Sequence, residues 1–155
     1  MKKDSPDTLQ KAETILKDYT GNSNEDKYPF VECATFADYL KDNGGAFQTE
    51  WHFIDSPYLD EGGNISDYDF TFDKHNITEA MSAIQQFITH SSGYRNSYEY
   101  QQIMQYLAGI KREKGSDDEK EALSIALRLI IHYVGDIHQP LHATARVDKE
   151  YEKGD

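Results

Sequence analysis

The stretch ALSIALRLIIHYVGDIHQPLH, residues 122–142, is the part of the chain that decides the fold. Its apolar residues fall on nearly every side of a helix, which is typical of a helix surrounded by other helices. The acidic residues 117–119 come just before it, where negative charge complements the positive end of the helix dipole. Pro140 ends the pattern, because proline lacks the amide hydrogen that a continuing helix needs. The sequence therefore predicts a buried central helix that begins near Ser116 or Asp117.

Four further helices are expected along the chain. Ser5 and Pro6 form a start signal for the first, which carries one apolar face as far as Tyr19. Asn76 with Glu79 three residues later resembles a capping box that opens a helix. No alternating strand pattern competes with the helical ones, and residues 20–29 and 56–76 are expected to be loops. The remaining helices are expected over about 31–42, 77–90 and 98–114.

The composition bounds the class of protein. A chain of 155 residues with 37% apolar residues is long enough for one modest core, so we predict a single all-α domain of about five helices over residues 1–155. The net charge of −12 repels polyanions, and the basic footprint of most nucleic-acid-binding proteins is missing. A nucleic-acid partner would therefore need a local positive source, for which a bound metal is the obvious candidate.

The cysteine content and the N-terminal sequence are the features from which the cellular compartment of the protein can be judged. Cys33 is the only cysteine, so no intrachain disulfide can form. The two lysines near the N-terminus are not followed by an apolar stretch, and the sequence as written predicts neither a signal peptide nor a membrane span. Two glycosylation sequons, at Asn64 and Asn76, would fit a secreted glycoprotein, although such triplets often arise by chance.

Two polar residues interrupt the apolar pattern of the predicted central helix near its C-terminal end. His132 and Asp136 are four residues apart, so they share one helix face with Cβ atoms about 5–6 Å apart and can converge on one metal ion. The break at Pro140 allows His142 to return to a neighbouring position. The alternative is a simple hydrogen-bonded His–Asp pair. Burial favours the metal, because an unpaired carboxylate in a dry interior costs several kcal/mol.

Two earlier segments carry similar interruptions. TFADYLKD places Asp38 inside a predicted helix with Lys41 one turn later, and EWHFID places His52 among large apolar residues, followed by Asp55. A single histidine in such surroundings is more often a satisfied core residue than a ligand. Three interruptions of apolar segments in one small chain together favour a metal site.

The motifs FADYLKD, WHFID and HYVGDIHQPLH, within residues 31–148, resemble the zinc-dependent single-strand-specific nucleases of the S1/P1 family. The resemblance implies a mainly helical fold related to that of zinc phospholipase C, and a cleft that holds three zinc ions. It implies an endonuclease that hydrolyses single-stranded DNA and RNA to 5′-phosphorylated products, and it leaves open whether 3′-nucleotides are also dephosphorylated. It also implies a secreted or lumenal protein.

The resemblance also assigns roles by position. It implies that the carboxylate of Asp136 bridges the first zinc and a second one, and that a base is bound in a pocket made by Phe53 and Asp55. Lys41 matches the basic residue that steadies the phosphate in the transition state, and His138 matches no ligand and is expected to be structural. The implied metal ligands are Asp38, His52 and His132 for the first zinc, Asp136 as the bridge, and His142 for the third.

The sequence departs from the family pattern at both ends. The N-terminal tryptophan of the family and the histidine five residues after it have no counterparts here. Family members also carry a Gly-Gly-Asn stretch and a further His-x-x-x-Asp pair downstream of the HYVGDIHQPLH motif, and neither follows that motif in this sequence. Asp148, Glu150 and Asp155 do not match these missing ligands. We therefore expect a domain truncated at both ends that has one complete zinc site, binds further zinc poorly and has weak or no nuclease activity.

Two other functions remain open from the sequence. A zinc phospholipase C would share the fold and the metal ligands, but the base-pocket residues Phe53 and Asp55 favour a nucleotide. A non-catalytic helical protein with one structural zinc is the other alternative. The sequence does not distinguish DNA from RNA, it indicates no membrane association, and a monomer is the default expectation for its oligomeric state.

Overall fold

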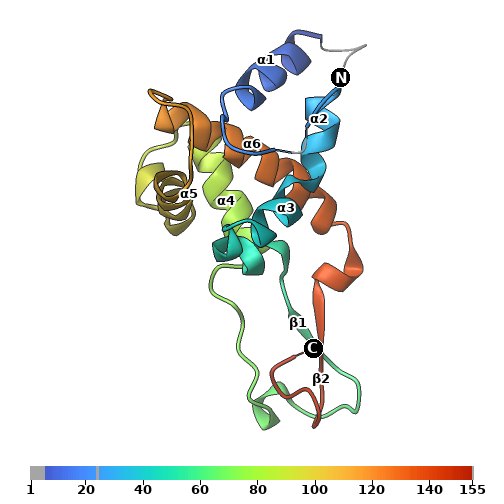
Figure 1. Ribbon diagram of the computed structural model, residues 1–155. Coiled ribbons are helices and arrows are strands. Elements are labelled where there is room, and N and C mark those ends of the chain that lie inside the picture. Colours follow the sequence, from blue (N-terminus) through green and yellow to red (C-terminus); the bar gives the residue numbers. More distant parts are fainter. Residues whose placement is uncertain (1–5, 24, 155) are drawn as a thin grey trace.

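The computed structural model describes residues 6–23 and 25–154, and it confirms the all-α expectation. Helices dominate the described residues, and the only strands there are one short pair (Figure 1). The predicted start of the first helix is seen from Pro6 onward, while Ser5 lies outside the described residues. The α-helices are α1 (Pro6–Leu16), α2 (Pro29–Glu32), α3 (Phe36–Asp42), α4 (Ile77–Ile88), α5 (Tyr98–Gly109) and α6 (Asp118–Asp136).

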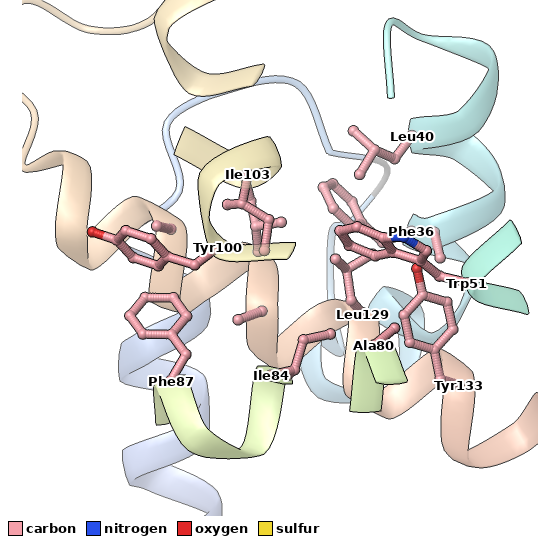
Figure 2. Close-up of a cluster of buried hydrophobic side chains, with 14 of the residues drawn as sticks. Phe36, Leu40, Trp51, Ala80, Ile84, Phe87, Tyr100, Ile103, Leu129 and Tyr133 are labelled. Atoms are coloured by element: carbon pink, nitrogen blue, oxygen red, sulfur yellow. The ribbon is translucent and has the colours of Figure 1, made fainter. Parts of the chain in front are cut away.

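The helix α6 is the predicted central helix. Asp117 caps it, because its side chain accepts hydrogen bonds from the amides of Glu119 and Lys120. The helices α1, α3, α4 and α5 all pack against α6, as Figure 1 shows. One continuous cluster of buried side chains runs along it, with Phe87 and Tyr100 at one end and Trp51 and Tyr133 at the other (Figure 2). None of the described helices is long and apolar enough to cross a bilayer.

Three details of the prediction were wrong. The helix expected over 31–42 is broken into α2, the short 3₁₀ helix η1 (Cys33–Thr35) and α3. The helix expected to reach residue 114 ends at Gly109, because Ile110 is already extended. The third error concerns strands: β1 (Ser56–Leu59) and β2 (Thr144–Val147) pair in parallel, in a register that sets Ser56 opposite Thr144.

A tight turn connects α3 to the 3₁₀ helix η2 (Ala46–His52). Gly44 has φ +91°, a conformation that side chains other than glycine rarely adopt. At Gly45 the constraint is space, since an added Cβ would lie 2.3 Å from Leu40 Cγ and 2.7 Å from the Leu40 carbonyl oxygen. The turn therefore requires two glycines for two different reasons, and it sets how η2 lies against α3.

The paired strands extend from the helical part of the molecule (Figure 1). Just before β1, the amide of Ile54 donates to the carbonyl of His142 at 2.9 Å, so the pairing starts immediately after the last helical turns. The segment between β1 and α4 includes the 3₁₀ helix η3 (Ile65–Asp67). A further 3₁₀ helix, η5 (Pro140–His142), connects α6 to β2.

Candidate metal centre

The structure brings together side chains from four elements where α6 ends. Asp38 comes from α3, and His52 is the last residue of η2. His132 and Asp136 lie one turn apart on α6, and His142 ends η5. These are the five residues that the sequence suggested as metal ligands.

Three of these side chains form a close triangle. His52 Nδ1 lies 2.9 Å from Asp136 Oδ2 and 3.1 Å from His132 Nε2, and His132 Nε2 lies 3.1 Å from the same carboxylate oxygen. The ligand atoms of Asp38, His52 and His132 also lie within 4.8 Å of one another. Within residues 6–23 and 25–154 this is the only such group of three or more histidine, cysteine or acidic side chains.

The other two residues lie at the edges of the triangle. Asp38 Oδ1 is 3.9 Å from His132 Nε2, and the Asp38 side chain is 63% exposed, so it can move towards an ion at little cost. His142 Nδ1 is 3.6 Å from Asp136 Oδ1, the carboxylate oxygen that faces away from the triangle. Asp136 thus presents one oxygen to His52 and His132 and the other to His142.

Hydrogen bonds to backbone carbonyls orient two of the imidazoles. His132 Nδ1 donates to the Ala34 carbonyl at 2.5 Å, which leaves Nε2 with its lone pair in the cluster. His142 Nδ1 donates to the His52 carbonyl at 3.0 Å. Such contacts fix the tautomer of metal-ligating histidines. The break between α2 and α3 has a role here, because Ala34 precedes the α3 cap residue Thr35 and its carbonyl lies outside the hydrogen-bond ladder of α3.

Burial disfavours the charged form of His52 in the cluster. The pKa of His52 is lowered from 6.5, mainly because burial disfavours the imidazolium and also because of repulsion by His132, although Asp136 opposes the shift. His52 Nε2 is buried without a hydrogen-bond partner in the described part of the chain, so Nδ1 is the nitrogen that faces the other ligands. A neutral imidazole is the form that binds metal.

The donor set fits a divalent metal ion. In a tetrahedral zinc site with bonds of about 2.0–2.1 Å, neighbouring ligand atoms lie roughly 3.3 Å apart. The sides of the triangle formed by His52, His132 and Asp136 are a few tenths of an ångström shorter. Two imidazole nitrogens and two carboxylates suit zinc and its first-row neighbours.

Of the residues assigned to the substrate, Phe53 contacts the cluster. Phe53 directly follows His52, and its ring stacks on His142 with centroids 4.6 Å apart and planes at 27°. Asp55 is half-buried two residues further on. Lys41 lies one turn after Asp38 on α3 and forms no ion pair with any described residue. His138, expected to be structural, is exposed and donates from Nδ1 to the Val134 carbonyl at 2.6 Å.

Sequence reasoning missed two polar residues behind the cluster. Tyr133 and Gln48 are both 0% exposed, and the Tyr133 hydroxyl donates to Gln48 Oε1 at 2.6 Å. Burial and the nearby carboxylates of Asp136 and Asp38 raise the pKa of Tyr133 well above 10.0, so the hydroxyl remains a donor. The available signal was a glutamine among the aromatic residues Phe47 and Trp51.

Comparison with known proteins identifies the family. The family model described as S1/P1 Nuclease matches residues 3–154, a wider range than the motif-based resemblance over 31–148. No curated protein and no solved structure matches the chain significantly. The family match spans nearly all of the sequence, including the three motifs and all five cluster residues. The chain therefore belongs to the S1/P1 nuclease family, whose members are hydrolases that act on nucleic acids.

Proposed function

We propose that this nuclease depends on zinc and hydrolyses phosphodiester bonds of single-stranded DNA and RNA to 5′-phosphorylated products. The observation that carries the proposal is the convergence of two imidazoles and two carboxylates at the end of α6. Imidazole nitrogen and carboxylate oxygen together form a ligand set typical of catalytic zinc. The ligands in the proposal are Asp38, His52, His132 and Asp136, with His142 beside Asp136.

The proposal assigns metal binding to the ligands and phosphate binding to a neighbouring lysine. His52 and His132 would hold the metal through imidazole nitrogens, and the carboxylate of Asp136 would offset part of its charge. Bound zinc supplies positive charge for the phosphate and lowers the pKa of a coordinated water towards neutrality. The ammonium of Lys41 is available to pair with a phosphate oxygen, since no described residue forms an ion pair with it.

The aromatic ring beside the cluster supports the single-strand preference. One face of the partly exposed Phe53 ring stacks on His142, and a nucleobase would stack on the opposite face. Base–aromatic stacking tolerates any base but requires an unpaired one, because the faces of a paired base are occupied by its neighbours. The carboxylate of Asp55 is an acceptor for base amino or imino groups, whereas a phospholipid headgroup offers no ring to stack on Phe53.

The first test is metal content together with substrate choice. After dialysis against a weak chelator, we expect one tightly held zinc per chain, because the described residues contain one complete ligand group. Denatured DNA and RNA should release acid-soluble nucleotides, slowly, and duplex DNA more slowly still. Three tightly held zinc ions would contradict the stoichiometry, and hydrolysis of phosphatidylcholine in place of nucleic acid would identify a phospholipase.

The second test is the variant Asp136→Asn, with His138→Gln as a matched control in the same motif. The amide is a weaker ligand than the carboxylate, so we expect this variant to lose zinc affinity and at least a hundredfold in turnover. The His138 side chain lies outside the cluster and donates to the Val134 carbonyl, so the control should keep both its zinc affinity and its turnover. If Asp136→Asn lowers the melting temperature while turnover persists, the zinc is structural.

A further inference from the structure

We infer that a buried hydrogen-bond bridge from Tyr133 through Gln48 to the Ala37 carbonyl positions the ligands of the metal centre. The Tyr133 hydroxyl donates to Gln48 Oε1 at 2.6 Å, and Gln48 Nε2 donates to the Ala37 carbonyl at 2.9 Å. All three residues are 0% exposed, so bulk water does not reach the bridge. The inference rests on the zinc site of the proposed function.

Each member of the bridge is close to a ligand in the sequence. Ala37 immediately precedes Asp38 on α3, and Tyr133 immediately follows His132 on α6. Gln48 lies four residues before His52 on η2. The bridge thus joins the three elements that carry the group of Asp38, His52 and His132, although Tyr133 on α6 is 85 residues away from Gln48 in the sequence.

The Tyr133 ring also contacts the ligands directly. Its edge-to-face contacts with the imidazoles of His52 and His132 have centroid distances of 5.2 Å and 5.9 Å and interplanar angles of 83° and 81°. The hydroxyl at the far end of the ring is fixed by Gln48, so the ring has one orientation against both imidazoles. Metal ligands need this support, since a site is only as well defined as the residues behind it.

Stability alone offers a competing explanation for the same hydrogen bonds. Any buried hydroxyl or amide needs a partner, whether or not a metal site lies nearby. The two explanations differ when both partners are replaced by apolar groups of the same shape, because that exchange has little effect on folding. A positioning role predicts that metal binding weakens even when the fold stays equally stable.

The experiment compares three variants with the parent chain: Tyr133→Phe, the double variant Tyr133→Phe/Gln48→Met, and Tyr100→Phe. Tyr100 is the matched control, because its hydroxyl donates to Glu119 at the same distance of 2.6 Å. Figure 2 shows Tyr100 and Tyr133 at opposite ends of the buried cluster. Zinc affinity is measured by competition with a chromophoric chelator. The visible spectrum with Co²⁺ in place of zinc reports the coordination, and the melting temperature reports stability.

The expected result is that both bridge variants bind zinc about 10–100-fold more weakly and show an altered Co²⁺ spectrum. The double variant should do so with a melting temperature near that of the parent, and Tyr100→Phe should lose stability without losing affinity. Zinc affinity of the double variant within twofold of the parent would overturn the inference and leave the proposed function intact. A parent chain that binds neither metal at the cluster would overturn both.

Discussion

At the residue scale, Arg128 is a buried charged side chain that connects distant parts of the fold. It lies on α6 and is 2% exposed, yet every direction of its guanidinium is satisfied. It pairs with both carboxylate oxygens of Glu25 at 2.6 and 2.7 Å, and it donates to the Leu16 carbonyl at 2.9 Å. The rings of Tyr19 and Phe36 lie 5.4 and 5.3 Å from it. One side chain thus attaches the N-terminal segments to the central helix.

Breaking this pair should be costly. We expect Arg128→Met to lower the free energy of unfolding by about 3–5 kcal/mol, because Glu25 then remains buried without a partner. The double variant Arg128→Met/Glu25→Leu should recover most of that loss, since no lone charge is left. Urea unfolding gives both values. Equal losses in the single and double variants would show that packing of the arginine stem, rather than its charge, matters.

Glu119 at the start of α6 predicts a dependence of stability on pH. Burial raises the pKa of its carboxyl group, but hydrogen bonds from Tyr100 and Tyr94 and the charge of Arg95 outweigh burial, so the pKa is lowered from 4.5 overall. A group with a lowered pKa in the folded state stabilises the protein above the pKa of the unfolded state. That contribution is lost as the pH falls below 4.5 and through the folded-state value.

The variant Glu119→Gln isolates this effect. As the pH falls below 4.5, the parent chain should lose stability more steeply than the variant. Above pH 6 the stabilities of the two proteins should change in parallel. Melting temperatures recorded at half-unit pH steps measure the difference. Identical slopes for the two proteins in the acid range would assign the acid sensitivity to other carboxylates.

Much of the cluster could be found residue by residue. His132 and Asp136 stand out because polar groups in a helix apolar on many sides need a partner. Gln48 and Tyr133 could not be paired from the sequence, since nothing local links two residues more than 80 positions apart. Asp38 was found through its motif, because an exposed aspartate on a short helix carries no signal of its own.

At the element scale, the turn between α3 and η2 controls how two ligand-bearing elements face each other. The close approach of Gly45 to Leu40 leaves no room for a side chain. We expect Gly45→Ala to lower the free energy of unfolding by about 1–3 kcal/mol, because η2 must shift away from α3. Zinc affinity should fall as well, since Asp38 lies on the helix before this turn and His52 on the helix after it.

Gly109→Ala provides the matched control for that prediction. Gly109 lies in α5, and an added Cβ would meet nothing within 4 Å. Alanine is favoured over glycine in a helix by roughly 0.5–1 kcal/mol, so this variant should be unchanged or slightly more stable. Calorimetry of both variants with and without zinc tests the pair. A Gly45→Ala variant as stable as Gly109→Ala would mean that the turn relaxes freely.

Elements were predictable where local patterns are strong. The central helix has both a capping residue and a continuous apolar pattern, and both features are local. The break between α2 and α3 was not predictable, because the hydrogen bond from His132 to Ala34 that accompanies it comes from a distant helix. The two strands were not predicted, because each has only four residues and parallel pairing joins segments far apart in the sequence.

At the scale of the whole molecule, net charge governs the approach of the substrate. One zinc changes the formal charge from −12 to −12 + 2 = −10, so the molecule as a whole still repels a polyanion. We expect the association rate of a single-stranded oligonucleotide to rise as salt increases from about 10 to 100 mM, because salt screens this repulsion. Stopped-flow fluorescence measures the rate. A rate that falls with salt would reveal a local basic path to the cluster.

The parallel pairing of β1 and β2 has a consequence for which length changes this protein can tolerate. Each strand begins within a few residues of a ligand, His52 on one side and His142 on the other, and the two segments are aligned from Ile54 onward. A single residue inserted between either histidine and its strand would displace that imidazole by about 3.3 Å, more than a metal bond can stretch. Insertions between residues 60 and 72 add length only beyond β1. In this part of the chain, inserted residues should therefore be tolerated between residues 60 and 72 but not between either histidine and its strand.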